Sequence, residues 1–354
     1  MMHAHAEARV LSPSPSLPAM DKVLNYRNEI YGLCILWVTF FHIESVTHFP
    51  HYIPLLSEIL RLGNSAVDIF LFLSGYCLSL SFRRHPNLGR YFRRRFMRII
   101  IPYLLIAIPY FLWELFCESH IQGPLSMTGH FFFNLSGASF WCKGVQTTWF
   151  VHAIIAFYLV FPLLYHLVTR HKQGSWLLLG CIYAFIIVVH ELFPSTRLSA
   201  IAYSRLPAFT LGIMMACHGT KLPTSPKAIL LYAAYLFIAI YLFHVNTWLK
   251  THCSDYFWEW MFFITLIIPS LFIIERFVHF SGQHVRKCLK FVGDMSLEVY
   301  LTHVTILHII CFYSYNKILG GWTYLILSAI SLILAYVIYL ISNQLVKSTA
   351  IQVK

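Results

Sequence analysis

Residues 321–345 read GWTYLILSAISLILAYVIYLISNQL and contain no aspartate, glutamate, lysine or arginine. A helix rises about 1.5 Å per residue, so about 20 apolar residues cross the roughly 30 Å hydrocarbon core of a bilayer. Within lipid the backbone must satisfy its own hydrogen bonds, which a helix does inside one segment. We therefore predict that this stretch is a transmembrane helix.

The composition of the whole chain agrees with this prediction. Of its 354 residues, 58% are hydrophobic and 11% are charged, and the mean hydropathy is +0.66. A soluble domain carries about 25% charged residues. Similar apolar stretches recur along nearly the whole sequence, so we predict an all-α integral membrane protein with about ten transmembrane helices in one bundle. The predicted spans are 29–48, 64–82, 98–117, 147–168, 175–193, 200–217, 228–247, 256–275, 294–314 and 321–345.

The N-terminal segment differs from the rest. Residues 1–19 are rich in proline and serine and are neither apolar nor periodic. They contain no apolar core of a signal peptide. We expect a disordered extension over residues 1–19, followed by one polytopic membrane domain over residues 20–354.

The basic residues predict the orientation, because cytoplasmic loops carry an excess of lysine and arginine. With the N-terminus inside, 20 of the 26 lysines and arginines fall in cytoplasmic segments, 5 in external ones, and Arg205 within a helix. This split favours ten spans with both termini cytoplasmic, and it explains the net charge of +12 without a nucleic-acid partner.

The nine cysteines show no CxxC or zinc-site spacing, so no metal site is expected.

Two ionisable residues are predicted to lie deep in the bundle. A charged group inside hydrocarbon costs at least about 2.5–3.5 kcal/mol, so such groups usually face protein. His42 lies late in the first span, in ILWVTFFHIE, and either bridges to a neighbouring helix or performs catalysis. Asp68 lies at similar depth at the start of the next span. It either caps that helix or orients His42, as a carboxylate orients a catalytic imidazole.

A run of arginines follows the second span, where we expect a cytoplasmic loop. The segment 83–98, RRHPNLGRYFRRRFMR, holds seven arginines in sixteen residues and no lysine. It is interpreted either as a topology anchor that contacts anionic lipid or as a phosphate site, since arginine binds phosphate in a bidentate way. Arg94, Arg95 and Arg98 are the candidate phosphate-binding residues, and the last two share one face of a helix start.

The ninth predicted span carries a polar stripe. Ser296, Tyr300 and His303 follow i, i+4, i+7 spacing and share one helix face. On an otherwise apolar helix such a stripe faces protein. It either lines a site or packs against another helix.

Six segments, taken in order, carry a family resemblance. They are RNEIYGLCILWVTFFH, SAVDIFLFLSGY, RRRFMRIIIPYLL, WFVHAIIAFYLVFPLL, SRLPAFTLGI and VGDMSLEVYLTHV. Over about residues 26–310 the chain resembles the acyltransferase family 3 membrane proteins. The resemblance implies a ten-helix, multi-pass enzyme of the bacterial inner (cell) membrane. Such an enzyme moves an acetyl or other acyl group from cytoplasmic acyl-coenzyme A to a sugar, often of a surface polysaccharide.

The resemblance also implies roles for individual residues. The catalytic histidine of the family falls on His42, and its arginine pair falls on Arg95 and Arg98. Many members place an arginine eleven residues before the histidine, where this chain has Tyr31. Either Arg27 serves in its place or this arginine is dispensable here.

The resulting hypothesis starts with arginines that hold the donor's phosphates at the cytoplasmic face. The pantetheine arm threads between helices to His42, which acts as a general base or as a transient acyl carrier. Acyl-coenzyme A is then a substrate, and no permanently bound cofactor is expected. The partners are this donor, a carbohydrate acceptor and the lipid bilayer.

Two rival functions belong to other classes. A proton-coupled transporter would use His42, Glu44, Asp68 and Glu114 as a relay, but the sequence shows no internal repeat or paired broken helices. A non-catalytic sensor or scaffold would leave the arginine run without a role.

Overall fold

The structure is a computed structural model, and it confirms an all-helical chain. Throughout the ranges that it describes, the regular elements are helices and none is a strand. The ranges are 18–47, 53–118, 123–144, 147–170, 174–219, 223, 225–250 and 256–351. Of the predicted extension, residues 1–17 lie outside these ranges, while Pro18 begins the first helix.

Ten longer helices build the bundle. They are α2 (Arg27–Thr47), α4 (Ala66–Arg84), α5 (Leu88–Trp113), α8 (Trp149–Arg170), α9 (Gly174–Leu192), α11 (Leu206–His218), α12 (Pro226–Lys250), α14 (Ile267–Phe280), α16 (Ser296–Phe312) and α18 (Thr323–Ile351). The shorter helices are α1 (Pro18–Asn25), α3 (Pro54–Arg61), α6 (Pro124–Leu135), α7 (Ala138–Lys143), α10 (Ala200–Tyr203), α13 (Phe257–Phe263), α15 (Gln283–Asp294) and α17 (Tyr315–Leu319). Short 3₁₀ segments are η1 (Leu62–Ser65), η3 (Pro194–Ser199), η4 (Ile264–Leu266) and η5 (Gly320–Trp322), and η2 (Glu114–Glu118) is a short π-helical segment.

The helices support a multi-pass membrane protein. Among the described residues, eight helical stretches are long and apolar enough to cross a membrane. The pair α15 and α16 also passes when taken together, with a bend of 73° between its halves, and Pro226–Leu242 of α12 is apolar but shorter. Every predicted span coincides with one of these helices. The total of ten and the orientation of the termini stay predictions.

Three predicted loops are helical instead. The arginine run lies mostly on α5, which begins at Leu88 rather than at residue 98. Asn87 caps this helix, with its side chain accepting the Arg90 N–H at 2.8 Å, and arginine is itself a good helix former. The predicted loop before the ninth span forms α15, whose apolar residues Leu289 and Val292 are buried. The predicted external loop after α5 contains α6 and α7.

Glycines allow two pairs of helices to approach closely. Gly75 of α4 lies against the carbonyl of Phe209 on α11, and Gly212 of α11 lies against the carbonyl of Phe72 on α4. In each place a Cβ atom would clash with backbone, so only glycine permits the contact. Gly32 of α2 meets α15 in the same way.

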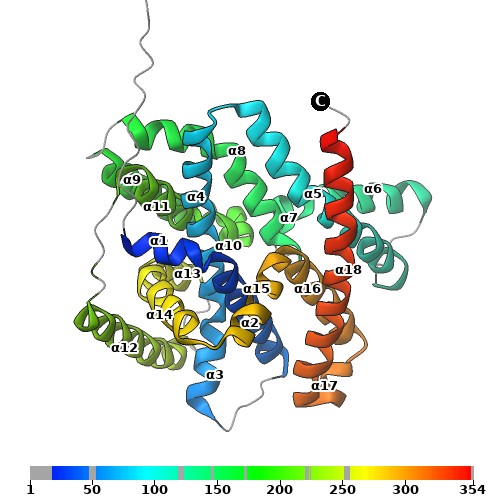
Figure 1. Ribbon diagram of the computed structural model, residues 1–354. Coiled ribbons are helices and arrows are strands. Elements are labelled where there is room, and N and C mark those ends of the chain that lie inside the picture. Colours follow the sequence, from blue (N-terminus) through cyan, green and yellow to red (C-terminus); the bar gives the residue numbers. More distant parts are fainter. Residues whose placement is uncertain are drawn as a thin grey trace, which may run out of the picture.

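Figure 1 shows how these pairs are arranged. Helices α2 and α4 lie in the middle of the bundle, α18 runs along one side against α16 and α5, and α12 lies against α14 at the opposite edge. Large apolar side chains such as Phe185 of α9, Leu230 of α12 and Ile333 of α18 are exposed on the outside. Exposed apolar surface of this kind suits contact with lipid tails.

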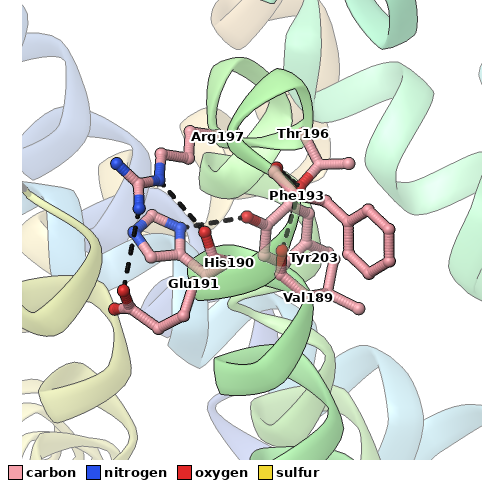
Figure 2. Close-up of polar contacts among 7 residues, drawn as sticks. All are labelled: Val189, His190, Glu191, Phe193, Thr196, Arg197 and Tyr203. Atoms are coloured by element: carbon pink, nitrogen blue, oxygen red, sulfur yellow. Dashed lines mark hydrogen bonds and ion pairs between the residues drawn. The ribbon is translucent and has the colours of Figure 1, made fainter.

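One end of α9 is tied to the segment that follows it (Figure 2). The His190 ring contacts the Tyr203 hydroxyl at 3.1 Å, and Arg197 Nε donates to the His190 carbonyl at 3.0 Å. Arg197 also pairs with Glu191 at 3.6 Å. These contacts hold η3 and α10 in place, immediately before the break between α10 and α11 at which Arg205 lies.

Candidate functional site

A cavity of about 800 Å³ has His42 in its wall. We call it the histidine cavity. Its polar lining includes Glu44, Asn64 and His308. Its aromatic lining consists of Phe41, Trp149, Tyr256, Trp260 and Tyr300. A space with several aromatic walls and a few polar groups is typical of a site for an organic ligand.

His42 has a second histidine as its neighbour. His42 Nδ1 lies 3.0 Å from the Val38 carbonyl oxygen and 3.2 Å from His303 Nε2. His303 Nδ1 in turn lies 2.9 Å from the Val299 carbonyl oxygen. His42 is half-buried and His303 is 0% exposed. The interaction joins α2 to α16 at the wall of the histidine cavity.

A second cavity, of about 380 Å³, collects arginines from two helices. We call it the arginine cavity. Arg95 and Arg98 of α5 line it together with Arg27, the first residue of α2. Arg94 does not line this cavity but a neighbouring one of about 210 Å³, whose walls also include Arg95 and Arg98. The three candidate phosphate-binding residues therefore lie together, and Arg27 joins them.

A small apolar cavity of about 70 Å³ lies between the other two, and we call it the passage. It shares four lining residues with the arginine cavity, namely Phe70, Phe150, Ser296 and Leu297. It shares three with the histidine cavity, namely Val38, Val67 and Tyr300. The three cavities therefore adjoin one another in series, with the small apolar passage between the arginine cavity and the histidine cavity.

Asp68 has a different partner from the one predicted. Its carboxylate forms an ion pair with Arg205, rather than orienting His42. Arg205 is 0% exposed, and its Nη2 donates to Asn64 Oδ1 at 2.8 Å. Its guanidinium carbon lies 5.7 Å from the ring centres of Trp149 and Phe263. A fully buried cation requires a counter-charge, and the Asp68 carboxylate supplies it for Arg205.

The comparisons with known proteins agree with this geometry. The family described as an acyltransferase domain, acyltransferase family 3, matches residues 32–340. This chain belongs to acyltransferase family 3. It is also similar to acyltransferase MdmB of Streptomyces mycarofaciens, at 25% identity with 71% of this chain and 70% of that protein covered. No solved structure matches.

The polar stripe of the ninth predicted span belongs to the site of this acyltransferase. Ser296 lines the arginine cavity and the passage, and Tyr300 lines the passage and the histidine cavity. The Tyr300 hydroxyl donates to the Thr147 carbonyl at 2.9 Å and accepts from the Phe150 N–H at 3.3 Å, which fixes α16 against the start of α8. The i, i+4, i+7 spacing was the signal in the sequence, and it did not distinguish a stripe that lines a site from one that packs against another helix. The structure shows that the stripe does both.

Arg27 and Tyr31, both on α2, lie at the same cavity. Both line the arginine cavity, and Arg27 Nη1 lies 4.0 Å from Cys77 Sγ. Arg27 thus reaches the same space as Arg95 and Arg98.

Among the described residues no group of three or more histidine, cysteine or acidic side chains is arranged to hold a metal ion.

Proposed function

We propose that this acyltransferase moves an acyl group, most simply acetyl, from acyl-coenzyme A on the cytoplasmic side to a hydroxyl of a carbohydrate. The acceptor would be a surface polysaccharide or its lipid-linked precursor. In this proposal the chain crosses the bacterial inner membrane ten times with both termini cytoplasmic. The observation that carries the proposal is the series of three cavities between the arginines and His42.

The donor suits the arginine cavity and the passage. Coenzyme A carries a pyrophosphate and a further phosphate at one end and a thin pantetheine arm that ends in the thioester. Guanidinium groups bind phosphate through charge-assisted, often bidentate, hydrogen bonds. A narrow section lined by Phe70, Phe150 and Leu297 admits a slender chain while it excludes the charged end of the donor. The phosphates would thus stay with the arginines while the thioester reaches His42.

The chemistry at His42 has two balanced routes. As a general base, His42 takes the proton of the acceptor hydroxyl while that oxygen attacks the thioester carbonyl. The C–S bond then breaks, and the leaving thiolate takes the proton from His42 to become the thiol. As an acyl carrier, His42 attacks the thioester carbonyl, and the C–S bond breaks with release of the thiolate. The acceptor hydroxyl then attacks the acyl-imidazole, the N–C bond breaks to free His42, and the hydroxyl proton goes to the thiolate. Both routes need a ring nitrogen with a free lone pair at the histidine cavity.

The histidine cavity suits a carbohydrate acceptor. Aromatic faces such as those of Trp149, Trp260 and Tyr300 pack against the C–H faces of a sugar ring. The Glu44 carboxylate accepts hydrogen bonds from sugar hydroxyls, and the Asn64 amide both accepts and donates them. A volume of about 800 Å³ is large enough for a drug-sized ligand.

The rival function, a proton-coupled transporter, finds less support. A relay would require its carboxylates to lie near one another or near His42. Glu44 lines the same cavity as His42, but Asp68 pairs with Arg205, and Glu114 Oε2 accepts from Asn134 at 3.3 Å. Each carboxylate contacts a different part of the bundle.

The test is a transfer assay with purified protein in liposomes. Acetyl-coenzyme A labelled in the acetyl group is added with extracted lipid-linked and polysaccharide acceptors, and the label in the carbohydrate fraction is measured. We expect label there with the wild type and none with His42→Ala. Dissipation of a proton gradient without acyl transfer would contradict the proposal and favour the transporter.

A further inference from the structure

The neighbour of His42 on α16 extends the mechanism. We infer that His303 is a positioning residue that fixes the tautomer of His42 with a bare Nε2 at the histidine cavity and shares the proton that His42 takes up. This inference deepens the proposed function and rests on it for the reaction step.

The Val299 carbonyl determines the proton on His303. A carbonyl oxygen only accepts hydrogen bonds, so His303 Nδ1, 2.9 Å away, must carry a hydrogen. His303 is 0% exposed, and its hydrogen-bond partners, the backbone of Val299 and Tyr300 and the His42 ring, carry no negative charge. Burial without a counter-charge favours the neutral ring. His303 Nε2 is therefore a bare acceptor that points at His42.

The tautomer of His42 follows from its own two neighbours. His42 Nδ1 faces the Val38 carbonyl oxygen at 3.0 Å and His303 Nε2 at 3.2 Å, and both are acceptors. Nδ1 must carry the hydrogen, which these two acceptors share. The lone pair of neutral His42 is then on Nε2, on the ring edge away from both partners. Hydrogen-bond partners, rather than observed hydrogens, decide this assignment.

The His42 and His303 rings together then accept the proton of the acceptor hydroxyl. When His42 Nε2 takes the proton of the acceptor hydroxyl, its ring becomes an imidazolium. The hydrogen bond from Nδ1 to His303 Nε2 becomes charge-assisted and therefore stronger. The Nδ1 proton can move to His303, so that the charge is spread over two rings, and it returns when His42 protonates the leaving thiolate. His303 thus takes the place that a carboxylate has beside other catalytic histidines, since Asp68 is engaged by Arg205.

Two substitutions separate this role from helix packing. His303→Leu fills similar space but offers no acceptor, and His303→Gln offers an amide oxygen that accepts a hydrogen bond but takes no proton. We expect kcat to fall roughly 10- to 100-fold in His303→Leu, with KM for acetyl-coenzyme A little changed, and less in His303→Gln. Equal losses in both variants, or a wild-type kcat in His303→Leu, would overturn the inference.

A second measurement does not depend on acyl transfer. Diethylpyrocarbonate modifies the bare nitrogen of neutral histidine, and mass spectrometry gives the rate at each site. His308 lines the same cavity and serves as the internal reference. We expect His303→Leu to slow the modification of His42 several-fold relative to that of His308. An unchanged rate of His42 modification would overturn the inference. If the modification rates are as expected but the wild-type protein transfers no acetyl group, the proposed function alone is wrong.

Discussion

His42 contacts its neighbours through one ring nitrogen. Its Nδ1 meets a backbone carbonyl and His303, so the chemistry assigned to this residue depends on the other nitrogen. Side chains that imitate only the Nδ1 contact should therefore preserve the helix contact and lose the reaction.

The first prediction concerns His42→Asn and His42→Gln. Both side chains hydrogen-bond but take no proton at neutral pH, so we expect acyl transfer to fall about 10²–10⁴-fold, as in His42→Ala. The measurement is the rate of label transfer from acetyl-coenzyme A. The control is His166→Gln, an exposed histidine on the spanning helix α8, which should keep wild-type activity. His48, a control nearer in sequence, lies outside the described residues. Near wild-type turnover in His42→Gln would reduce this histidine to a helix bridge.

The arginines are the second case at this scale. Arg95→Ala with Arg98→Ala removes charge-assisted contacts worth about 1.5–3 kcal/mol each, so the affinity for acyl-coenzyme A should fall tenfold or more. Equilibrium binding of labelled donor to the purified variant measures this change.

The control for the arginine pair follows from the structure. Arg83 and Arg84 look like a remote pair in the sequence, but Arg83 Nη2 donates to the Ala216 carbonyl at 2.7 Å and Arg84 lines a neighbouring cavity. Arg93→Ala with Arg170→Ala removes the same charge from two exposed sites that line none of the three cavities in series. An equal loss of affinity in this pair would indicate diffuse electrostatics rather than a phosphate site.

At the scale of elements, the contact between α4 and α11 supports the wall of the histidine cavity. The two helices approach closely through Gly75 and Gly212, and the ion pair of Asp68 with Arg205 closes one end of their contact. Asn64, which accepts from Arg205, lines the cavity. The site therefore depends on two helices that supply neither His42 nor the arginines of α5.

The prediction at this scale is that Asp68→Asn destabilises the protein. It leaves a buried arginine without its counter-charge, which costs about 3–5 kcal/mol. Replacing both partners, with Asp68→Leu and Arg205→Met, should restore most of the stability, because two apolar side chains bury no charge. Thermal unfolding in detergent measures both variants. If Asp68→Asn unfolds like the wild type but has lost acyl transfer, Asp68 takes part in the chemistry itself.

At the scale of the whole molecule, the two ends of the cavity series differ in chemistry. Three arginines line the arginine cavity, whereas the histidine cavity has five aromatic side chains, two glutamates and one arginine in its wall. In the orientation predicted from the split of basic residues, the cationic end would face the cytoplasm. A donor that enters there and an acceptor that enters at the other end would meet at His42.

This arrangement makes a prediction about topology. A reporter that is active only in the cytoplasm should work when fused after Lys354 and fail when inserted within residues 123–144. Reporter activity in whole cells is the measurement, with membrane insertion checked by fractionation. The reverse pattern would refute ten spans with cytoplasmic termini and would move the arginines to the outer face.

The sequence by itself determined the membrane class, the positions of the long apolar helices and the residues to test first. These conclusions are local, because the length of an apolar stretch and the cost of a charge within it do not depend on what packs beside it. His42 was found in this way, whereas Arg95 and Arg98 were found from the run of arginines at 83–98 and from the family resemblance. The helical start of α5 at Asn87 carried a local signal as well, since a capping asparagine followed by helix-forming arginines is visible in the sequence.

Only the tertiary structure decided which of these residues meet. The pairing of Asp68 with Arg205 joins residues 137 apart in the chain, and that of His42 with His303 joins residues 261 apart. Such contacts depend on the rotation and crossing of each helix. In a membrane protein both the lipid-facing and the protein-facing sides of a helix are apolar, so hydropathy leaves that rotation open. The glycines at the α4–α11 contact and the burial of Arg205 resolve it, and the series of cavities follows.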